Sequence, residues 1–356
     1  MLNYYYKKAA LRKFFFCLDK LLFFKLKKNP YQVKRVLVVN LGGLGDVLLM
    51  EPLIRQIAKL WPLASIDILV DTLAQDILDN HPNIHSIETF ALPWLSHSRP
   101  SWMTSLKLFL LQIKLLKAKS YDLVFDIKGD PLIILLLTLA GIKYRIGFIN
   151  GGLGALLHEG YDFFSYKLPR AQLNYLLLSS FWQNWQLEEA RPVLTLTETE
   201  LAWAPAEKVR LCNPNKKTIA IHLGGGRPEK IWSSHYWGHL LDDLSAYNLL
   251  VIGSKSDYNL FASLNNVELI NGLGYELRQS AALISQADLF IGGDSGPGHI
   301  AAALGVPVIS IFSLVNDPQT WAANKAKLIT YASNYTSEQL DTKALELKTA
   351  ILAALN

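Results

Sequence analysis

The chain has 356 residues, about half of them hydrophobic, which is enough for one large core or two ordinary ones and excludes a disordered protein. Its two cysteines, Cys17 and Cys212, exclude a disulfide framework and a cysteine-based zinc site, and they suit a reducing cytoplasm. The net charge of +5 is uneven, because residues 1–35 carry +9 and the rest of the chain carries −4. A nucleic-acid-binding protein spreads its basic charge over the folded surface, so nucleic acid is not expected as a partner.

The N-terminal segment, residues 1–34, is rich in Phe, Tyr and Leu as well as Lys and Arg. Charges interrupt every apolar run, which excludes a signal peptide and a transmembrane helix. On a helical wheel the apolar side collects Leu11, Phe14, Phe15, Leu18, Leu21 and Leu22, and the polar side collects Lys8, Arg12, Lys13, Asp19, Lys20 and Lys27, with Phe16 and Phe23 among them. The favoured interpretation is an interfacial helix that places residues 1–30 on an anionic membrane surface. The alternative is a helix packed on the folded domain with its lysines in solvent.

The next region, residues 35–191, alternates predicted strands and helices. An apolar, β-branched run at 36–40 predicts a strand buried on both faces, and 47–60 reads as a helix with Pro52 as a kink or a tight start. The other expected elements are strands at 65–70, 87–90, 121–127 and 145–148 and helices at 106–117 and 132–140. This alternation predicts a parallel sheet in an N-terminal domain.

Residues 192–217 interrupt the alternation with Pro192, Pro205 and Pro214 and are interpreted as an interdomain linker. The alternation resumes in a second domain, 218–330, and a helical segment follows at 331–356. The elements expected there are strands at 218–223, 249–253, 288–292 and 306–312 and helices at 237–245, 277–286 and 299–304. The predicted fold class is therefore α/β, with two Rossmann-like domains facing across a cleft and a ligand at the carboxyl ends of the strands.

A first glycine-rich turn, with Gly42, Gly43 and Gly45, follows the first strand and ends in Asp46. A dinucleotide fingerprint needs a third glycine that this turn lacks, and the carboxylate of Asp46 stands where a pyrophosphate would dock. Asp46 is either a helix cap, worth about 1 kcal/mol, or a general base directed into the cleft. The residue alone leaves both roles open.

A second glycine-rich turn, residues 224–232, also follows a predicted strand. The backbone N–H groups of Gly225 and Gly226 can cradle phosphate oxygens, and Lys230 adds a positive charge. The alternative is an ordinary loop with a solvated Arg-Glu-Lys cluster.

A third turn, residues 293–299, opens a helix with small residues, which leaves the helix N-terminus open to an anion. Ser295 and the N–H of Gly296 are candidate phosphate ligands, and Asp294 is a candidate for sugar or ribose hydroxyls. His299 either faces the phosphate or packs in the domain.

Together the three turns predict displacement at a sugar carbon of a nucleotide-sugar, with a diphosphate as the leaving group. No acidic pair spaced for a metal ion stands beside the phosphate turns. The helix dipole and Lys230 can stabilise the departing charge, so neither a metal nor a cofactor is expected.

Four blocks of the sequence resemble glycosyltransferase family 9, the lipopolysaccharide heptosyltransferases. They are residues 35–53, 121–148, 226–232 and 288–312; they occur in the family's order, and the resemblance covers residues 35 to about 330. The last block is the most specific of the four.

The resemblance implies a GT-B fold, metal-independent chemistry and inversion at the anomeric carbon. It implies ADP-heptose as the donor and a lipid-linked saccharide of the lipopolysaccharide core as the acceptor. With the thiols and the basic N-terminal segment described above, the expected location is cytoplasmic and peripheral on the inner face of the bacterial inner membrane. Asp46 matches the family's proposed base and Asp294 a position near the donor sugar. The positions around the donor diphosphate are matched by Lys230, Ser295, Gly296 and His299.

The sequence departs from the family at three positions. Gly225 and Gly226 replace hydroxyl residues that touch phosphate in better-known members, so any contact there is made by the backbone, and Lys128 stands where members often have Gln. These departures keep open a transferase of the same fold that uses another nucleotide-sugar. A nicotinamide-dependent oxidoreductase is favoured only by the first turn, and a non-catalytic lipid- or sugar-binding protein is disfavoured by the intact Asp46.

Overall fold

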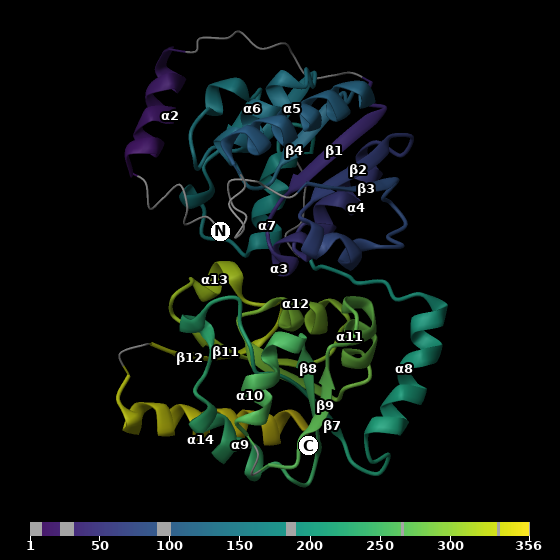
Figure 1. Ribbon diagram of the computed structural model, residues 1–356, viewed down its shortest axis with the longest axis vertical. Helices are drawn as coiled ribbons and strands as arrows, with labels where there is room; N and C mark the ends of the chain where they lie inside the picture. The colour runs from purple at the N-terminus through teal and green to yellow at the C-terminus, as the bar shows by residue number, and fades with distance from the viewer. Residues whose placement is uncertain are drawn as a thin grey trace. The chain divides into compact units, whose positions relative to one another are not determined.

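The computed structural model describes residues 9–21, 32–90, 101–182, 190–264, 267–332 and 335–355. The chain divides into two compact units, Met1–Ala190 and Arg191–Asn356, shown in purple to teal and in teal to yellow in Figure 1. Each unit contains one six-stranded sheet whose neighbouring strands run parallel. None of the helices in the described ranges has the length and apolar composition needed to cross a membrane.

The sheet of the first unit has the strand order β3-β2-β1-β4-β5-β6. Its strands are β1 (Arg35–Asn40), β2 (Ser65–Val70), β3 (Ser86–Thr89), β4 (Leu123–Asp126), β5 (Tyr144–Phe148) and β6 (Glu159–Tyr161). The helices are α2 (Ala9–Leu21), α3 (Leu44–Leu48), α4 (Glu51–Leu60), α5 (Trp102–Lys119), α6 (Pro131–Leu139) and α7 (Arg170–Tyr175), with the short turns η1 (Thr72–Leu78), η2 (Gly154–Leu156), η3 (Phe163–Ser165) and η4 (Leu176–Leu178). Helices α5 and α6 share one face of this sheet, because Leu116 and Leu136 belong to the same buried cluster as Leu37 and Val124.

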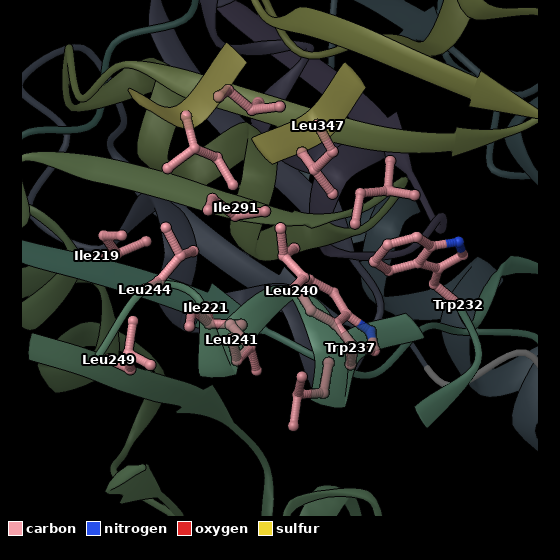
Figure 2. Packing of buried hydrophobic residues seen from close by; sticks show 14 of the residues in the cluster. Ile219, Ile221, Trp232, Trp237, Leu240, Leu241, Leu244, Leu249, Ile291 and Leu347 are labelled. Atoms are coloured by element: carbon pink, nitrogen blue, oxygen red, sulfur yellow. The ribbon is translucent and has the colours of Figure 1, made fainter. Parts of the chain in front are cut away.

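The sheet of the second unit has the order β12-β11-β10-β7-β8-β9. Its strands are β7 (Thr218–His222), β8 (Asn248–Gly253), β9 (Ile270–Leu273), β10 (Leu289–Gly293), β11 (Val308–Ser313) and β12 (Lys327–Tyr331). The helices are α8 (Glu198–Leu211), α9 (Ser234–Asp242), α10 (Tyr258–Ala262), α11 (Leu277–Ile284), α12 (Gly296–Ala303), α13 (Pro318–Trp321) and α14 (Ser337–Leu355), with η6 (Pro228–Lys230) and η7 (Lys255–Asp257). In Figure 2 Trp237 and Leu241 of α9 lie with Leu347 of α14 around Ile291 of β10, and together they form one buried cluster.

Counted from its own first strand, each sheet has the same order, 3-2-1-4-5-6. This is the Rossmann order, in which the chain reverses direction across the sheet between the first and fourth strands. The reversal falls between β1 and β4 in one unit and between β7 and β10 in the other. In such sheets ligands bind at the carboxyl ends of the strands beside the reversal. The expected α/β class with two Rossmann-like units is confirmed.

The stretch 192–217 differs from the expected linker, because most of it forms the helix α8. Thr197 caps this helix by accepting a hydrogen bond from Glu200 N (3.2 Å), and the Glu200 carboxylate accepts one from Thr197 N (2.7 Å). Glu200 also pairs with Arg278 of α11 at 2.6 Å, so α8 is attached to the second unit. The sequence contains a Thr-x-x-Glu capping box, which indicates the start of a helix, but the three prolines of this stretch favoured an irregular linker. Pro205 lies inside the helix.

Other element boundaries also differ from those expected. The helix expected at 47–60 is divided into α3 and α4, and Pro52 stands in the first turn of α4, where its missing N–H costs no hydrogen bond. The strands β6, β9 and β12 were not expected. The helical segment expected from 331 begins only at Ser337, because Tyr331 is the last residue of β12.

Helix α2 confirms a helix in the N-terminal segment and shows which of its described side chains are covered. Phe15 is buried in a cluster with Ile134 of α6 and Leu156 of η2, and Asp19 accepts a hydrogen bond from Ala155 N (2.9 Å). Phe14, which the wheel groups with Phe15 on the apolar side, is exposed, whereas Phe15 is covered. Lys8, Leu22, Phe23 and Lys27 lie outside the described residues, as do the side chains of Leu11, Arg12, Lys20 and Leu21.

Candidate functional site

The first glycine-rich turn is held by hydrogen bonds from buried Asn40, the last residue of β1. Asn40 Nδ2 donates to the Asp46 carbonyl oxygen (2.8 Å), and Asn40 Oδ1 accepts from Gly42 N (3.2 Å). Asp46 lies in the first turn of α3, where its Oδ2 accepts from Gly43 N (3.1 Å). Asp46 therefore does act as a cap, and the same carboxylate is fixed at the carboxyl end of β1.

Lys128, two residues after β4, forms an ion pair with Asp46 across the reversal point of the sheet. Lys128 Nζ lies 2.9 Å from Asp46 Oδ2, and the two side chains are 15% and 18% exposed. A Cβ atom at Gly42 would lie 2.6 Å from both Asp46 Oδ2 and Lys128 Cε, so a larger residue there would separate the pair. A Cβ at Gly43 would meet nothing within 4 Å. Gly42 is thus required by the pair and Gly43 is not.

The environment of Asp46 keeps its carboxylate charged. Burial acts to raise the pKa of Asp46, but the positive charges of Lys128 and Arg170 and the hydrogen bonds from Lys128 and Gly43 outweigh it and hold the pKa below its usual value. Asp46 Oδ1 is buried, and it accepts no hydrogen bond from the described residues. A buried, ionised oxygen without a donor is costly unless a ligand supplies one.

Two further buried ionisable residues, Arg170 and Asp126, lie in the same constellation. The Arg170 guanidinium stacks over Phe148 and Phe163, at 5.1 and 4.7 Å from the ring centroids, and donates to the carbonyl oxygen of Ile127 (2.5 Å). Burial lowers the pKa of Arg170 to about 10, so it stays charged at neutral pH. Sequence reasoning missed Arg170, which stands in no motif and reaches the site only through α7.

Asp126, the last residue of β4, shapes the loop that carries Lys128. Its Oδ1 accepts hydrogen bonds from Lys128 N (3.0 Å) and Gly129 N (3.2 Å). Burial raises the pKa of Asp126 to about 7. It lay inside a block that carried the family resemblance, but the sequence suggested no role for it.

The second unit brings together Lys230 and Asp294 across its own reversal point. Lys230 Nζ lies 2.5 Å from Asp294 Oδ2, and Asn316 Nδ2 donates to the same oxygen (2.8 Å). The two charged side chains are 13% and 7% exposed. Sequence reasoning had named both residues but not their contact, and it had missed Asn316, which precedes α13.

Ser295 stands at the N-cap of α12, but its side chain makes no capping hydrogen bond. Its Oγ donates to the carbonyl oxygen of Gly293 (3.2 Å) and lies 3.0 Å from His222 Nδ1. Burial lowers the pKa of His222, which nearby Asp257 opposes, so the ring is neutral at neutral pH. The backbone N–H groups of the first turn of α12, including Gly296, are therefore left uncapped by Ser295, an arrangement that favours an anion. His222 was also missed.

The remaining expected site residues differ in what surrounds them. His299 is buried in the first turns of α12. A Cβ at Gly226 would meet nothing within 4 Å, and one at Gly225 would make only ordinary contacts. At Gly224, by contrast, a Cβ would collide with Asp257. Across the described ranges, no group of three or more His, Cys, Asp or Glu side chains is arranged to hold a metal ion.

Comparison with known proteins gives one consistent family. The family model described as Glycosyltransferase family 9 (heptosyltransferase) matches residues 111–349. Lipopolysaccharide heptosyltransferase 3 of Escherichia coli (strain K12) is 27% identical over 320 residues, which are 80% of this chain and 87% of that protein. Lipopolysaccharide heptosyltransferase 1 of Campylobacter coli is 26% identical over 314 residues, 78% and 83% of the two chains.

Solved structures agree on the fold. The glycosyl transferase family 9 protein from Veillonella parvula DSM 2008 superposes with a TM-score of 0.76 at 18% identity, covering 93% of this chain and 99% of that one. The E. coli ADP-heptose lps heptosyltransferase II gives a TM-score of 0.72 at 20% identity, covering 90% and 98%. The fold is GT-B, with one Rossmann-like domain in each unit. This chain belongs to glycosyltransferase family 9, the heptosyltransferases, and is a glycosyltransferase related to the enzymes of lipopolysaccharide synthesis.

Proposed function

We propose that the chain transfers heptose from ADP-heptose to a saccharide of the lipopolysaccharide core, with inversion and without a metal ion. The observation that carries the proposal is the state of Asp46, whose carboxylate is charged and whose Oδ1 is buried without a donor among the described residues. A general base needs such an oxygen, which is charged and can accept a hydrogen bond from the hydroxyl group of an acceptor.

In this mechanism the acceptor hydroxyl donates its hydrogen bond to Asp46 Oδ1. Its oxygen attacks the anomeric carbon as the bond from that carbon to the phosphate oxygen breaks, and the ADP leaving group takes the bonding electron pair. The proton moves to Asp46, while Lys128 and Gly43 hold Oδ2 in place. A single displacement of this kind inverts the anomeric centre.

The second unit, through residues 218–330, is assigned to the nucleotide-sugar, and residues 35–191 are assigned to the acceptor. Lys230 and the uncapped N-terminus of α12 at Ser295 and Gly296 stabilise the negative charge on the diphosphate. The backbones of Gly225 and Gly226 add donors where no side chain intervenes. When the donor binds, the Asp294 carboxylate exchanges its ion pair with Lys230 for hydrogen bonds from the hydroxyl groups of the donor sugar.

The choice of ADP-heptose is supported by the relatives. One solved relative is described as an ADP-heptose lps heptosyltransferase, and the E. coli heptosyltransferase WaaC has been solved with ADP. The alternative for this chain is another nucleotide-sugar handled by the same fold.

The N-terminal segment, residues 1–30, is proposed to attach the enzyme to the anionic cytoplasmic face of the inner membrane, where a lipid-linked acceptor is available. Support comes from its charge and from α2, which docks through Phe15 and leaves Lys13 and Phe14 exposed. Removal of residues 1–30 would also uncover the Phe15 cluster. The sharper test is therefore Lys13→Gln with Phe14→Ser in the full chain, measured by binding to anionic vesicles.

The test of the proposed reaction is turnover of ADP-heptose against a panel of truncated lipopolysaccharide acceptors, with mass spectrometry of the products. The expected result is one acceptor that gains a single heptose mass, with release of ADP and inverted configuration by NMR. Transfer only from UDP- or GDP-sugars would overturn the choice of ADP-heptose as the donor.

A further inference from the structure

Helix α5, Trp102–Lys119, presents an unusually apolar surface to solvent. Six large side chains, all at least 47% exposed, point away from the core along its length: Trp102, Met103, Leu106, Leu110, Leu111 and Leu115. Single exposed leucines are ordinary on protein surfaces, but a continuous set on one helix marks an interaction site.

The opposite side of α5 already fulfils the usual packing role of a surface helix. Leu116 is buried in the core cluster over the sheet, and Phe109 and Ile113 pack against that cluster. Helix α5 is therefore apolar on both sides, although the part of the chain that the structure describes covers only one of them. A helix that is apolar all round is normally covered all round.

The charge on α5 indicates what covers the second side. The helix contains four lysines and no Asp or Glu. Lys119 pairs with Glu88, whereas Lys107, Lys114 and Lys117 are exposed and form no ion pair with any described residue. Exposed leucines and a tryptophan interleaved with lysines match an anionic lipid surface, where the apolar groups enter the interface and the lysines meet the headgroups.

A second copy of the chain fits this surface less well. A two-fold contact places the same patch on both subunits, so α5 would face α5. The lysines would then approach lysines with no acidic partner on either helix. We propose that α5 lies on the surface of an anionic lipid bilayer and is a membrane-binding element of this protein, separate from residues 1–30.

The neighbouring helices are consistent with this orientation. Helix α6 packs beside α5 over the sheet through Leu136, and on its other side Ile134 joins the cluster with Phe15 of α2 (Figure 1). Helix α6 thus contacts both α5 and α2, and α2 carries the exposed residues Phe14 and Lys13.

The test uses the full-length protein and sedimentation with phosphatidylcholine vesicles, with and without phosphatidylglycerol. Each lysine near an anionic lipid surface contributes to the binding free energy, and every 1.4 kcal/mol lost lowers the affinity about tenfold. Lys107→Gln combined with Lys114→Gln should therefore weaken partitioning into the anionic vesicles about thirty-fold. Leu110→Ser combined with Leu111→Ser should weaken it at least about tenfold through lost apolar burial. Wild-type binding should fall as salt is raised.

Two matched control variants lie in the other unit. Lys325→Gln with Lys327→Gln removes two exposed lysines, and Leu201→Ser with Val209→Ser removes two exposed apolar groups from α8. Both should bind vesicles as the wild type does. All variants change exposed positions, so their thermal unfolding should match the wild type and report that they fold.

Unchanged vesicle binding of both α5 variants would overturn the proposal and leave residues 1–30 as the membrane element. Light scattering supplies a second decisive result. If the wild type is an oligomer that Leu110→Ser with Leu111→Ser converts to a monomer, without loss of vesicle binding, α5 is an interface between copies. None of these measurements depends on sugar transfer, so they stand whichever donor the enzyme uses.

Discussion

Lys128 Nζ lies 2.9 Å from Asp46 Oδ2, and this contact joins the loop after β4 to the first turn of the helix after β1. The pair fixes one carboxylate oxygen and leaves the other, Oδ1, buried without a donor among the described residues. The proposed chemistry depends on this difference between the two carboxylate oxygens. The substitutions Asp46→Asn, Lys128→Gln and Gly42→Ala each alter the pair.

Replacing Asp46 with Asn should remove the base while keeping the shape of the side chain. The Asn carbonyl oxygen can still accept from Gly43 N, so the helix cap and the fold should survive. Turnover should fall about 10²- to 10⁴-fold, the usual contribution of a general base, while the affinity for ADP measured by calorimetry stays as in the wild type. Full activity of this variant would remove Asp46 from the chemistry.

Lys128→Gln should move the acid limb of the pH–rate profile. Burial raises the pKa of Asp46 and Lys128 is the largest influence that lowers it, so loss of this lysine raises the pKa of the carboxylate. A base works only when deprotonated, and activity should therefore begin to fall at a higher pH than in the wild type. The measurement is kcat/KM from acidic to neutral pH.

The matched control is Lys143→Gln, which removes a lysine paired with Asp122, a carboxylate outside this constellation. Its profile should coincide with that of the wild type. Coincidence of the Lys128→Gln profile as well would show that a group other than Asp46 sets the acid limb.

Gly42→Ala should damage the site through sterics alone. The new methyl group would lie 2.6 Å from Asp46 Oδ2 and from Lys128 Cε, so the pair must separate. Overpacking of this kind costs about 1–3 kcal/mol, and both Tm and turnover should fall. Gly43→Ala adds its methyl group to open space at φ −72°, so its Tm should stay that of the wild type. Equal Tm values for the two variants would contradict the geometry.

Lys230→Met should weaken ADP binding about ten- to hundred-fold, the range for a hydrogen bond to a charged group. It should also lower Tm, because among the described residues it leaves the largely buried carboxylate of Asp294 with Asn316 as its one remaining hydrogen-bond donor. Adding Asp294→Asn to Lys230→Met should restore Tm but not the affinity.

The control for this prediction is Lys255→Met, at an exposed lysine of η7 in the same unit. It should bind ADP normally. Wild-type affinity in Lys230→Met would exclude Lys230 from the diphosphate site.

Asp126→Asn should stabilise the protein at neutral and alkaline pH. Burial raises the pKa of Asp126 to about 7, so the folded state holds its proton to higher pH than the unfolded state does. The wild type therefore loses stability as the pH rises from about 4 to about 7, and Asn, which cannot ionise, avoids that loss. Urea unfolding at pH 5 and pH 8 should show an advantage for the variant that is larger at pH 8.

The sequence predicted the alternation of strands and helices because β-branched runs and glycine-rich turns are local signals. It also identified Asp46, Lys230 and Asp294, which stand in those turns. It did not predict α8, because three prolines suggested an irregular linker although Thr197 and Glu200 formed a capping box. Short edge strands such as β6 carry too few residues for a clear pattern.

The missing site residues share a different cause. Arg170 and His222 reach their constellations through tertiary packing. The stacking of Arg170 on Phe163 and the contact of His222 with Ser295 cannot be inferred from the spacing of these residues in the sequence. The ion pairs of Asp46 and Asp294 were missed because each joins two strands that are distant in the chain and adjacent in the sheet.

The repeated strand order has a consequence for how this protein can change over generations. Each constellation is assembled from side chains of a single unit, Asp46 with Lys128 and Arg170 in one, Lys230 with Asp294 and Ser295 in the other. A substitution in residues 1–190 therefore leaves the contacts of the second constellation intact. On the roles proposed above, a duplicated gene can acquire a new acceptor while it inherits its donor chemistry unchanged.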